Sequence, residues 1–234
     1  MKISIVIPAY NEEKYIGRTL ESINNLKENG WDIEVLVIDG DSSDKTPEVA
    51  RAYGANVVHE PHKGIGFARQ EGIKHATGEL VFFTDADTIV PPNWVVEHMK
   101  ALSGEGVCCS YGGFRYYDGT FPLYYLFNYV QPILVYLAYK LFAFPAASGQ
   151  NIAFWRKKAI EIGGFDEDIQ VLEDTDFAIR MKKAGKVVYL PNLLIYSSGR
   201  RSREGWRFYL RMIKSYFQYF IFRRNTLERF PDFR

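Results

Sequence analysis

Short apolar runs alternate along the chain with longer segments in which apolar residues recur every three or four positions. Such runs are typical of buried strands, and the longer spacing is typical of amphipathic helices. The first predicted strands are 3–7, 34–38, 56–59 and 80–84, and the first predicted helices are 12–29, 45–53 and 66–76. This alternation predicts an α/β fold: a doubly wound, mostly parallel sheet with helices on both faces.

Local signals set the expected ends of these elements. The first strand should end at Pro8, which lacks a backbone N–H, and Asn11 should cap the helix that follows. The later predicted elements are a helix at 91–102, a strand at 107–114, a helix that ends at 162, a helix from 173 that stops at Gly185, and a strand at 187–190 that ends at Pro191.

Residues 123–144 form the most apolar stretch, and 22 helical residues would extend about 33 Å, enough to span a membrane. Asn128, Gln131 and Lys140 suit an interface better than a hydrocarbon core. A single crossing would also place Asp85 and the motifs after Ser148 on opposite sides. The stretch is therefore expected not to span, and either ordinary packed helices or a surface that meets lipid would explain it.

Composition limits the alternatives. With 47% hydrophobic and 24% charged residues, the 234 residues can form one globular domain, with or without an appendage. Cys108 and Cys109 are adjacent and cannot link distant segments, so a reducing cytosol is the expected compartment. The first residues resemble a strand rather than a signal peptide.

Charge is divided unevenly. Residues 200–234 carry a net charge of +7 within a chain of net charge +1. Aromatic and aliphatic residues recur there at helical spacing among basic ones, as at Trp206, Arg207 and Leu210. This pattern predicts a basic amphipathic helix that faces a membrane or packs on the protein. Nucleic-acid binding is the less favoured alternative, because the aromatic residues follow a helical stripe.

Two carboxylates end the most apolar of the early strands. Asp85 and Asp87 follow Leu80–Thr84, and ligands of open α/β sheets bind beyond the carboxyl ends of strands. Two neighbouring carboxylates repel each other unless a cation is present, and their hard oxygens suit Mg²⁺ or Mn²⁺. The simplest interpretation is a metal–diphosphate site, and the alternative is a solvated turn. The polar loops after the other strands, which begin at Pro8, Asp39 and Lys63, should lie at the same edge.

The order of these motifs resembles that of the family 2 glycosyltransferases of GT-A fold. The resemblance covers about residues 2–195 and rests on seven motifs, which are Pro8-Ala9-Tyr10-Asn11-Glu12-Glu13, Asp39 with Ser42-Ser43-Asp44, Lys63-Gly64, Gly78-Glu79, Asp85-Ala86-Asp87, Gly163-Gly164-Phe165-Asp166 and Glu173-Asp174. It implies an inverting transferase that uses a nucleotide-diphosphate sugar and Mg²⁺ or Mn²⁺. It also implies a catalytic domain at 1–199, followed by the basic helix at 200–234. Within the domain, 1–103 would bind the nucleotide sugar and 104–199, with the apolar 122–147, would bind the acceptor.

The resemblance assigns roles to individual residues. Asp174 would be the general base, with Glu173 beside it, and Asp87 would bind the metal directly. Asp85 would reach the metal or the ribose through water. The other expected donor-site residues are Pro8, Ala9, Tyr10, Glu12, Asp39, Lys63, Arg69 and Ala86, and the expected acceptor-site residues are Gly149 and Asn151.

Two departures from the family pattern stand out. The second loop has Asp39-Gly40-Asp41-Ser42, whereas the family usually has two adjacent aspartates. Many members carry a histidine after the final strand, where this chain has Arg200 and Arg201. Their guanidinium groups match phosphate oxygens and would hold the diphosphate, and the alternative is a solvated basic turn.

The expected function is therefore sugar transfer to an acceptor hydroxyl, because an acceptor phosphate would need no base. The acceptor is expected to be lipid-linked or a glycan, and the protein to be cytoplasmic and peripheral on the inner face of the cell membrane. Nucleic acid is not an expected partner. The alternative is a catalytically silent nucleotide-sugar- or lipid-binding protein of the same fold.

Overall fold

The computed structural model describes residues 1–27, 30–169, 171–200, 207, 210, 211, 214, 215 and 217–219. The strands are β1 (Lys2–Ala9), β2 (Asp32–Asp39), β3 (Asn56–His59), β4 (Leu80–Phe83), β5 (Thr88–Ile89), β6 (Val107–Tyr116), β7 (Ile152–Trp155) and β8 (Lys186–Ser197). The helices are α1 (Ile16–Lys27), α2 (Thr46–Ala52), α3 (Ile65–His75), α4 (Trp94–Leu102), α5 (Leu123–Tyr125), η1 (Leu126–Val130), α6 (Gln131–Phe142), α7 (Arg156–Glu161) and α8 (Glu173–Met181).

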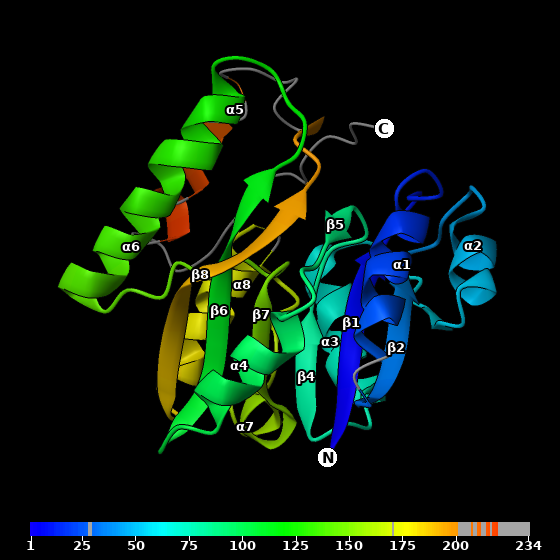
Figure 1. The fold of residues 1–234 in the computed structure, drawn as a ribbon, viewed down its shortest axis with the longest axis horizontal. Helices are drawn as coiled ribbons and strands as arrows, with labels where there is room; N and C mark the ends of the chain where they lie inside the picture. Colours follow the sequence, from blue (N-terminus) through cyan, green and yellow to red (C-terminus); the bar gives the residue numbers. More distant parts are fainter. Residues whose placement is uncertain are drawn as a thin grey trace.

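In the described part of the chain, the strands form one sheet in the order β3-β2-β1-β4-β7-β6-β8-β5 (Figure 1). The four strands β3, β2, β1 and β4 are parallel, and β6 is parallel to β8. β7 runs antiparallel to both β4 and β6, and β5 runs antiparallel to β8. The predicted mostly parallel α/β sheet is confirmed, with antiparallel strands confined to its second half.

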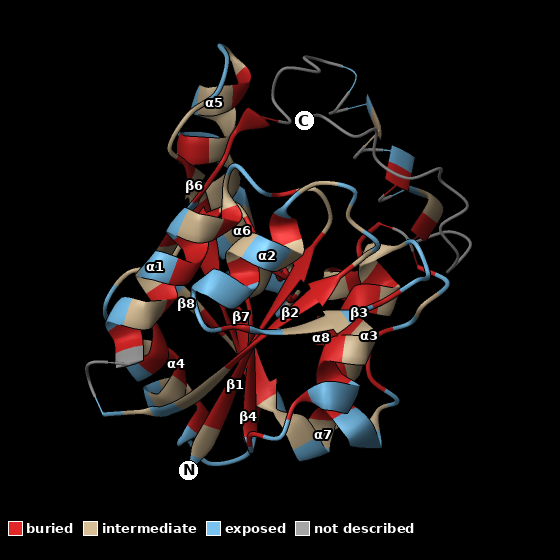
Figure 2. Cartoon of the chain, turned by 90° about the vertical axis from the view of Figure 1, so that its right-hand side faces the viewer, coloured by how far each residue is buried: buried red, intermediate tan, exposed pale blue. Residues whose placement is uncertain are grey.

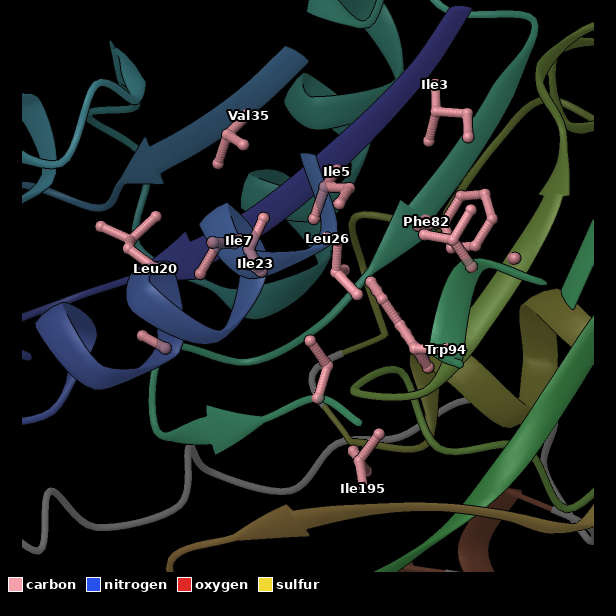
Figure 3. Close-up of a cluster of buried hydrophobic side chains, with 14 of the residues drawn as sticks. Ile3, Ile5, Ile7, Leu20, Ile23, Leu26, Val35, Phe82, Trp94 and Ile195 are labelled. Carbon is pink, nitrogen blue, oxygen red and sulfur yellow. The ribbon is translucent and has the colours of Figure 1, made fainter. Parts of the chain in front are cut away.

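Helices cover both faces of the sheet, because side chains alternate along each strand. Ile3, Ile5 and Ile7 of β1 point to the face covered by α1, α2 and α4, where Leu20, Ile23 and Trp94 meet them (Figure 3). Val6 and Phe83 point to the other face, which α3, α7 and α8 cover. The buried residues accordingly follow the strands and the inner sides of these helices (Figure 2).

Two strands continue past prolines that were expected to end them. β1 runs through Pro8 to Ala9. Because β4 ends opposite Val6, Pro8 is paired on one side only, with β2. β8 runs through Pro191 to Ser197, because the residues between Leu190 and Leu194 bulge out of the pairing with β6. The expected cap Asn11 is also wrong: α1 begins at Ile16, and the Asn11 carboxamide accepts hydrogen bonds from Ser43.

The apolar stretch forms a helical arm, defined here as residues 121–142, beside β6 and β8 (Figure 1). Among the described residues, no helix combines the length and apolarity needed to cross a membrane. The buried Asn128, in the π-helical turn η1, accepts a hydrogen bond from the Tyr116 N–H and donates one to its carbonyl (2.7 and 3.0 Å). Tyr139 of α6 packs against Tyr111 and Tyr189. These contacts hold the arm to the sheet.

Much of the arm's outer surface is apolar. Its exposed large side chains are Phe121, Tyr125, Tyr129, Val130, Ile133, Leu134, Tyr136, Leu137, Leu141 and Phe142. The predicted C-terminal helix falls mostly outside the described residues. Those that are described between 207 and 219 are helical, and the Tyr219 hydroxyl donates to Asp176 of α8 (2.7 Å).

Candidate active site

The parallel strands bring their carboxyl ends to one edge of the sheet. Ala9 of β1 pairs with Asp39 of β2, and Asp39 pairs with His59 of β3. β4 ends at the same edge, where the Thr84 N–H donates to the Val6 carbonyl (3.2 Å). The loops that carry the predicted donor-site residues therefore begin side by side.

The first two loops are fastened to each other. The backbone N–H of Asn11 donates to Ser42 Oγ (2.7 Å), and Asn11 Oδ1 accepts from the Ser43 N–H (2.7 Å). Glu12 N–H donates to Thr46 Oγ1 (2.6 Å). Asn11 has a positive φ of 52°, which turns the chain toward the second loop. The loops thus present a fixed surface.

Asp39 is buried between these loops with one oxygen available. Its Oδ2 accepts from the Ser42 N–H (3.3 Å), whereas its buried Oδ1 has no hydrogen-bond partner in the described part of the chain. A buried carboxylate oxygen without a donor is costly. A ligand N–H or hydroxyl at this position would remove that cost. Tyr10 is half-buried and follows Ala9, the β1 residue that pairs with Asp39. Pro8 and Ala9 are buried in β1, and Lys63 is exposed.

Hydrogen bonds from two threonines fix the backbone of the Asp85-Ala86-Asp87 turn. Thr19 of α1 donates its hydroxyl to the Ala86 carbonyl (2.8 Å), and the Thr88 N–H donates to the Asp85 carbonyl (3.2 Å). The Asp85 side chain keeps 32% of its surface exposed, whereas that of Asp87 keeps 13%. Ser197 of β8 donates to Asp87 Oδ1 (3.3 Å).

Arg200 approaches the same turn from the end of β8. Its guanidinium binds both carboxylate oxygens of Glu12, lies 3.3 Å from Asp87 Oδ2 and stacks over Tyr15. Burial lowers the pKa of Arg200, but Glu12 and Asp87 raise it more, so the pKa lies above its ordinary value. Glu12 was predicted to hold the nucleoside, and here it holds Arg200. Arg201 lies outside the described residues.

Asp118 is a supporting residue that the sequence did not reveal. Its Oδ1 accepts hydrogen bonds from the Gly199 N–H (2.6 Å) and from Ser198 Oγ (3.2 Å), which fixes the turn before Arg200. No local pattern marks Asp118, because its partners are far away in the sequence. Asp118 meets these partners because β6 and β8 end close to each other.

Glu173 and Asp174 form the first turn of α8, opposite the Asp85 turn. Asp174 Oδ2 accepts from the Gly149 N–H (2.8 Å), and its side chain is 20% exposed. Glu173 is more deeply buried and lies 3.0 Å from Arg69 of α3. Burial raises the pKa of both carboxyls above their ordinary values, and the Arg69 charge opposes this shift.

Of the two predicted acceptor-site residues, Gly149 lies at the site and Asn151 does not. Asn151 is fully buried and uses its whole carboxamide inside the protein. Its Oδ1 accepts from Trp94 Nε1 (2.8 Å), and its Nδ2 donates to the carbonyls of Gly113 and Leu193 (2.7 and 3.1 Å). These bonds support a structural role and leave no group for an acceptor.

The residues present fit a hard divalent cation that shares its coordination with a ligand. Among the described residues, no group of three or more His, Cys, Asp or Glu side chains could hold a metal alone. Asp85 and Asp87 offer carboxylate oxygens, and the approach of Arg200 shows that the Asp87 site favours a positive charge. Mg²⁺ and Mn²⁺ are commonly bound by one or two carboxylates plus phosphate and water.

Comparison with known proteins identifies the family. Residues 4–163, more than half of the chain, match the family described as Glycosyl transferase family 2. The "Probable glycosyltransferase YdaM" of Bacillus subtilis is 26% identical over 222 residues, which cover 88% of this chain and 52% of YdaM. The chain thus spans about half the length of this relative.

Solved structures show the same fold. A mannosyltransferase from Pyrobaculum calidifontis, PcManGT in complex with GDP-Man and Mn²⁺, has a TM-score of 0.72 and 24% identity over 88% of this chain and 59% of its own. TarS of S. aureus in complex with UDP-GlcNAc has a TM-score of 0.63 and 22% identity over 85% of this chain and 58% of its own. The chain therefore has the GT-A fold and belongs to glycosyl transferase family 2.

Proposed function

We propose that this protein transfers a sugar from a nucleotide-diphosphate sugar to an acceptor hydroxyl, with inversion at the anomeric carbon and with help from Mg²⁺ or Mn²⁺. The observation that carries the proposal is the meeting of two carboxylate groups from different halves of the chain. Asp85, from the first half, and Asp174, from the second, both lie within 4 Å of the Arg69 guanidinium. A donor held at Asp85 and Asp87 would thus lie close to a carboxylate able to accept a proton.

The donor would be held by the first two loops and the Asp85 turn. Asp39 Oδ1 offers an acceptor for a nucleoside N–H or hydroxyl, and the half-buried Tyr10 would stack against a base. Arg200 has the planar fork that matches diphosphate oxygens, although in this structure it contacts Glu12 and Asp87. A bound divalent cation would neutralise the negative charge that develops on the leaving diphosphate.

Asp174 would act as the general base. The acceptor oxygen forms a bond to the anomeric carbon while the bond from that carbon to the phosphate oxygen breaks. The electron pair of the broken bond leaves with the nucleoside diphosphate, and the acceptor proton passes to Asp174. Attack opposite the leaving group inverts the anomeric carbon. The Gly149 N–H orients Asp174 for this step, and the partial exposure of Asp174 leaves it accessible to an acceptor.

The acceptor is proposed to be lipid-linked, and the protein to be peripheral on the inner face of the cell membrane. Support comes from the arm, where ten large apolar side chains are exposed and Lys140 is the single charged residue of 121–142. Three of the ten are tyrosines, which favour the interface between lipid and water. Positive residues on the described part of the C-terminal helix, such as Arg207 and Lys214, are exposed and would favour anionic lipid.

Calorimetric titration tests the donor site. The protein would be titrated with UDP, GDP and other nucleoside diphosphates and their sugar conjugates, first with Mn²⁺ and then with a chelator. Binding of one nucleoside series that requires Mn²⁺ is expected. No binding to any of them under either condition would contradict the proposal.

A further inference from the structure

Arg69 is a buried cation surrounded by carboxylates. Its side chain, from the first turns of α3, is 4% exposed. Its Nη1 lies 3.0 Å from Glu173 and 3.9 Å from Asp174, and its Nη2 lies 3.4 Å from Asp85. Burial lowers the pKa of Arg69, but Glu173, Asp85 and Asp174 raise it above its ordinary value. One guanidinium thus contacts both the donor-side carboxylate and the expected base.

The surroundings are shaped to hold this guanidinium. It lies 5.7 Å from the centre of the Phe165 ring, and Gly149 lies against it so closely that a Cβ on Gly149 would overlap it. Gly149 also donates its N–H to Asp174. The absence of a side chain at Gly149 therefore permits two contacts at once, one with Arg69 and one with the base.

Direct donor binding, the role expected for Arg69 from the sequence, agrees less well with this geometry. A side chain that is 96% buried presents little surface to a ligand, and its charge already faces three carboxylates. Asp85 and Asp174 are more exposed and can contact the substrates themselves. Arg69 is better placed to fix the distance between them.

We propose that Arg69 is a positioning residue that joins Asp85 to Asp174 and so sets the distance between the general base and the donor. The lack of a side chain at Gly149 leaves the space that the Arg69 guanidinium occupies. This inference rests on the proposed function. Two reacting groups must be held in register for fast transfer, and a misplacement of about 1 Å can cost about a hundredfold in rate. Lysine keeps the charge but has no fork, so it cannot contact both carboxylates in the same way.

The test compares R69K, G149A and the double variant with the wild type. The measured reaction is Mn²⁺-dependent release of nucleoside diphosphate from the sugar nucleotide that the protein binds best, with water as acceptor. We expect kcat to fall by about ten- to a hundredfold in R69K and in G149A, while KM for the sugar nucleotide and calorimetric affinity for the diphosphate stay within about twofold. The double variant should lose less than the product of the two effects, because both act through one contact.

Several results would overturn the inference. Unchanged kcat in R69K and G149A would do so, and so would a rise in KM at constant kcat, which would indicate donor binding by Arg69. Thermal unfolding of each variant shows whether the fold is intact, and R69K retains a cation among the buried acids. Failure of the underlying function looks different: the wild type would then bind no sugar nucleotide, or D174N would still release the diphosphate at full rate.

Discussion

The two halves of the molecule are built differently, although one sheet runs through both. Residues 1–103, the N-terminal half, contain four parallel strands, β1 to β4, that alternate with helices, and one short antiparallel strand, β5. The loops after β1 and β2 hydrogen-bond to each other. Residues 104–199, the C-terminal half, contain an antiparallel strand, a bulged strand, a π-helical turn and the exposed arm. The regular half supplies Asp39, Asp85 and Asp87, and the irregular half supplies Asp174. The proposed donor carboxylates therefore stand on regular α/β structure, whereas the proposed base depends on the irregular half for its position.

The largest expected effect separates chemistry from binding. D174N keeps the shape of the side chain but removes its ability to accept a proton, so turnover should fall by about 100- to 10,000-fold. The carboxylates proposed to hold the donor lie in the other half, so calorimetric affinity for the nucleoside diphosphate with Mn²⁺ should not change. Glu105, exposed before β6, provides the control E105Q. Near-wild-type turnover in D174N would show that Asp174 is not the base.

The second prediction concerns how the arm is fixed. N128A would leave the N–H and the carbonyl of Tyr116 without their side-chain partner in a buried place. Each such group costs about 1–3 kcal/mol, so the free energy of unfolding should fall by about 2–6 kcal/mol in urea titrations. Asn24, which makes one exposed hydrogen bond, provides the matched variant N24A, expected to change it by less than about 0.5 kcal/mol. Equal effects of the two would contradict this account of the arm.

The third prediction addresses the metal site proposed in the N-terminal half. D87A should reduce the Mn²⁺-dependent part of the diphosphate affinity at least about tenfold, since even residues that only support a metal ligand are worth that much. Affinity in the presence of chelator should remain close to that of the wild type. Calorimetry with and without Mn²⁺ measures both quantities, and an unchanged Mn²⁺ effect in D87A would assign the metal to other ligands.

A smaller effect is expected on the exposed apolar surface of the arm. Leu134 and Leu141 of the arm are 58% and 66% exposed, so changing both to serine should cost little stability. The affinity for phosphatidylglycerol vesicles, measured by sedimentation, should nevertheless fall by about tenfold if these side chains enter the interface between lipid and water. Ile160 of α7 is 52% exposed outside the arm, and I160S is the matched control. Equal binding by all three proteins would show that the arm does not meet lipid.

The sequence predicted the N-terminal half well because its information is local. Apolar runs such as Leu80–Phe83 end directly in the carboxylates that matter, and the parallel topology places those ends together. The C-terminal half depends on contacts that no local pattern reveals. Pro191 was expected to end β8, but the strand continues because Pro191 lies in a bulge that is not paired with β6. Asn151 was expected to contact the acceptor, but its amide hydrogen-bonds to three elements of the core. The close contact between Arg69 and Gly149 likewise forms only when α3 packs against the loop before β7.

The smallest expected effect concerns the N-terminal half and depends on pH. Glu34 of β2 accepts hydrogen bonds from Ser4 of β1 and from Thr77, in the turn before β4, and pairs with Lys2. Although burial raises the pKa of Glu34, these partners lower it from 4.5 to about 2. A carboxyl whose pKa is lower in the folded state stabilises the fold above its unfolded pKa, and this stability is lost as the pH falls through the folded pKa. E34Q should therefore be less stable than the wild type at pH 7, and the difference should shrink steadily between about pH 4.5 and 2. Urea unfolding of E34Q, E105Q and the wild type across this range measures it, and a difference that stays constant with pH would mean that the carboxylate charge is not what joins these three segments.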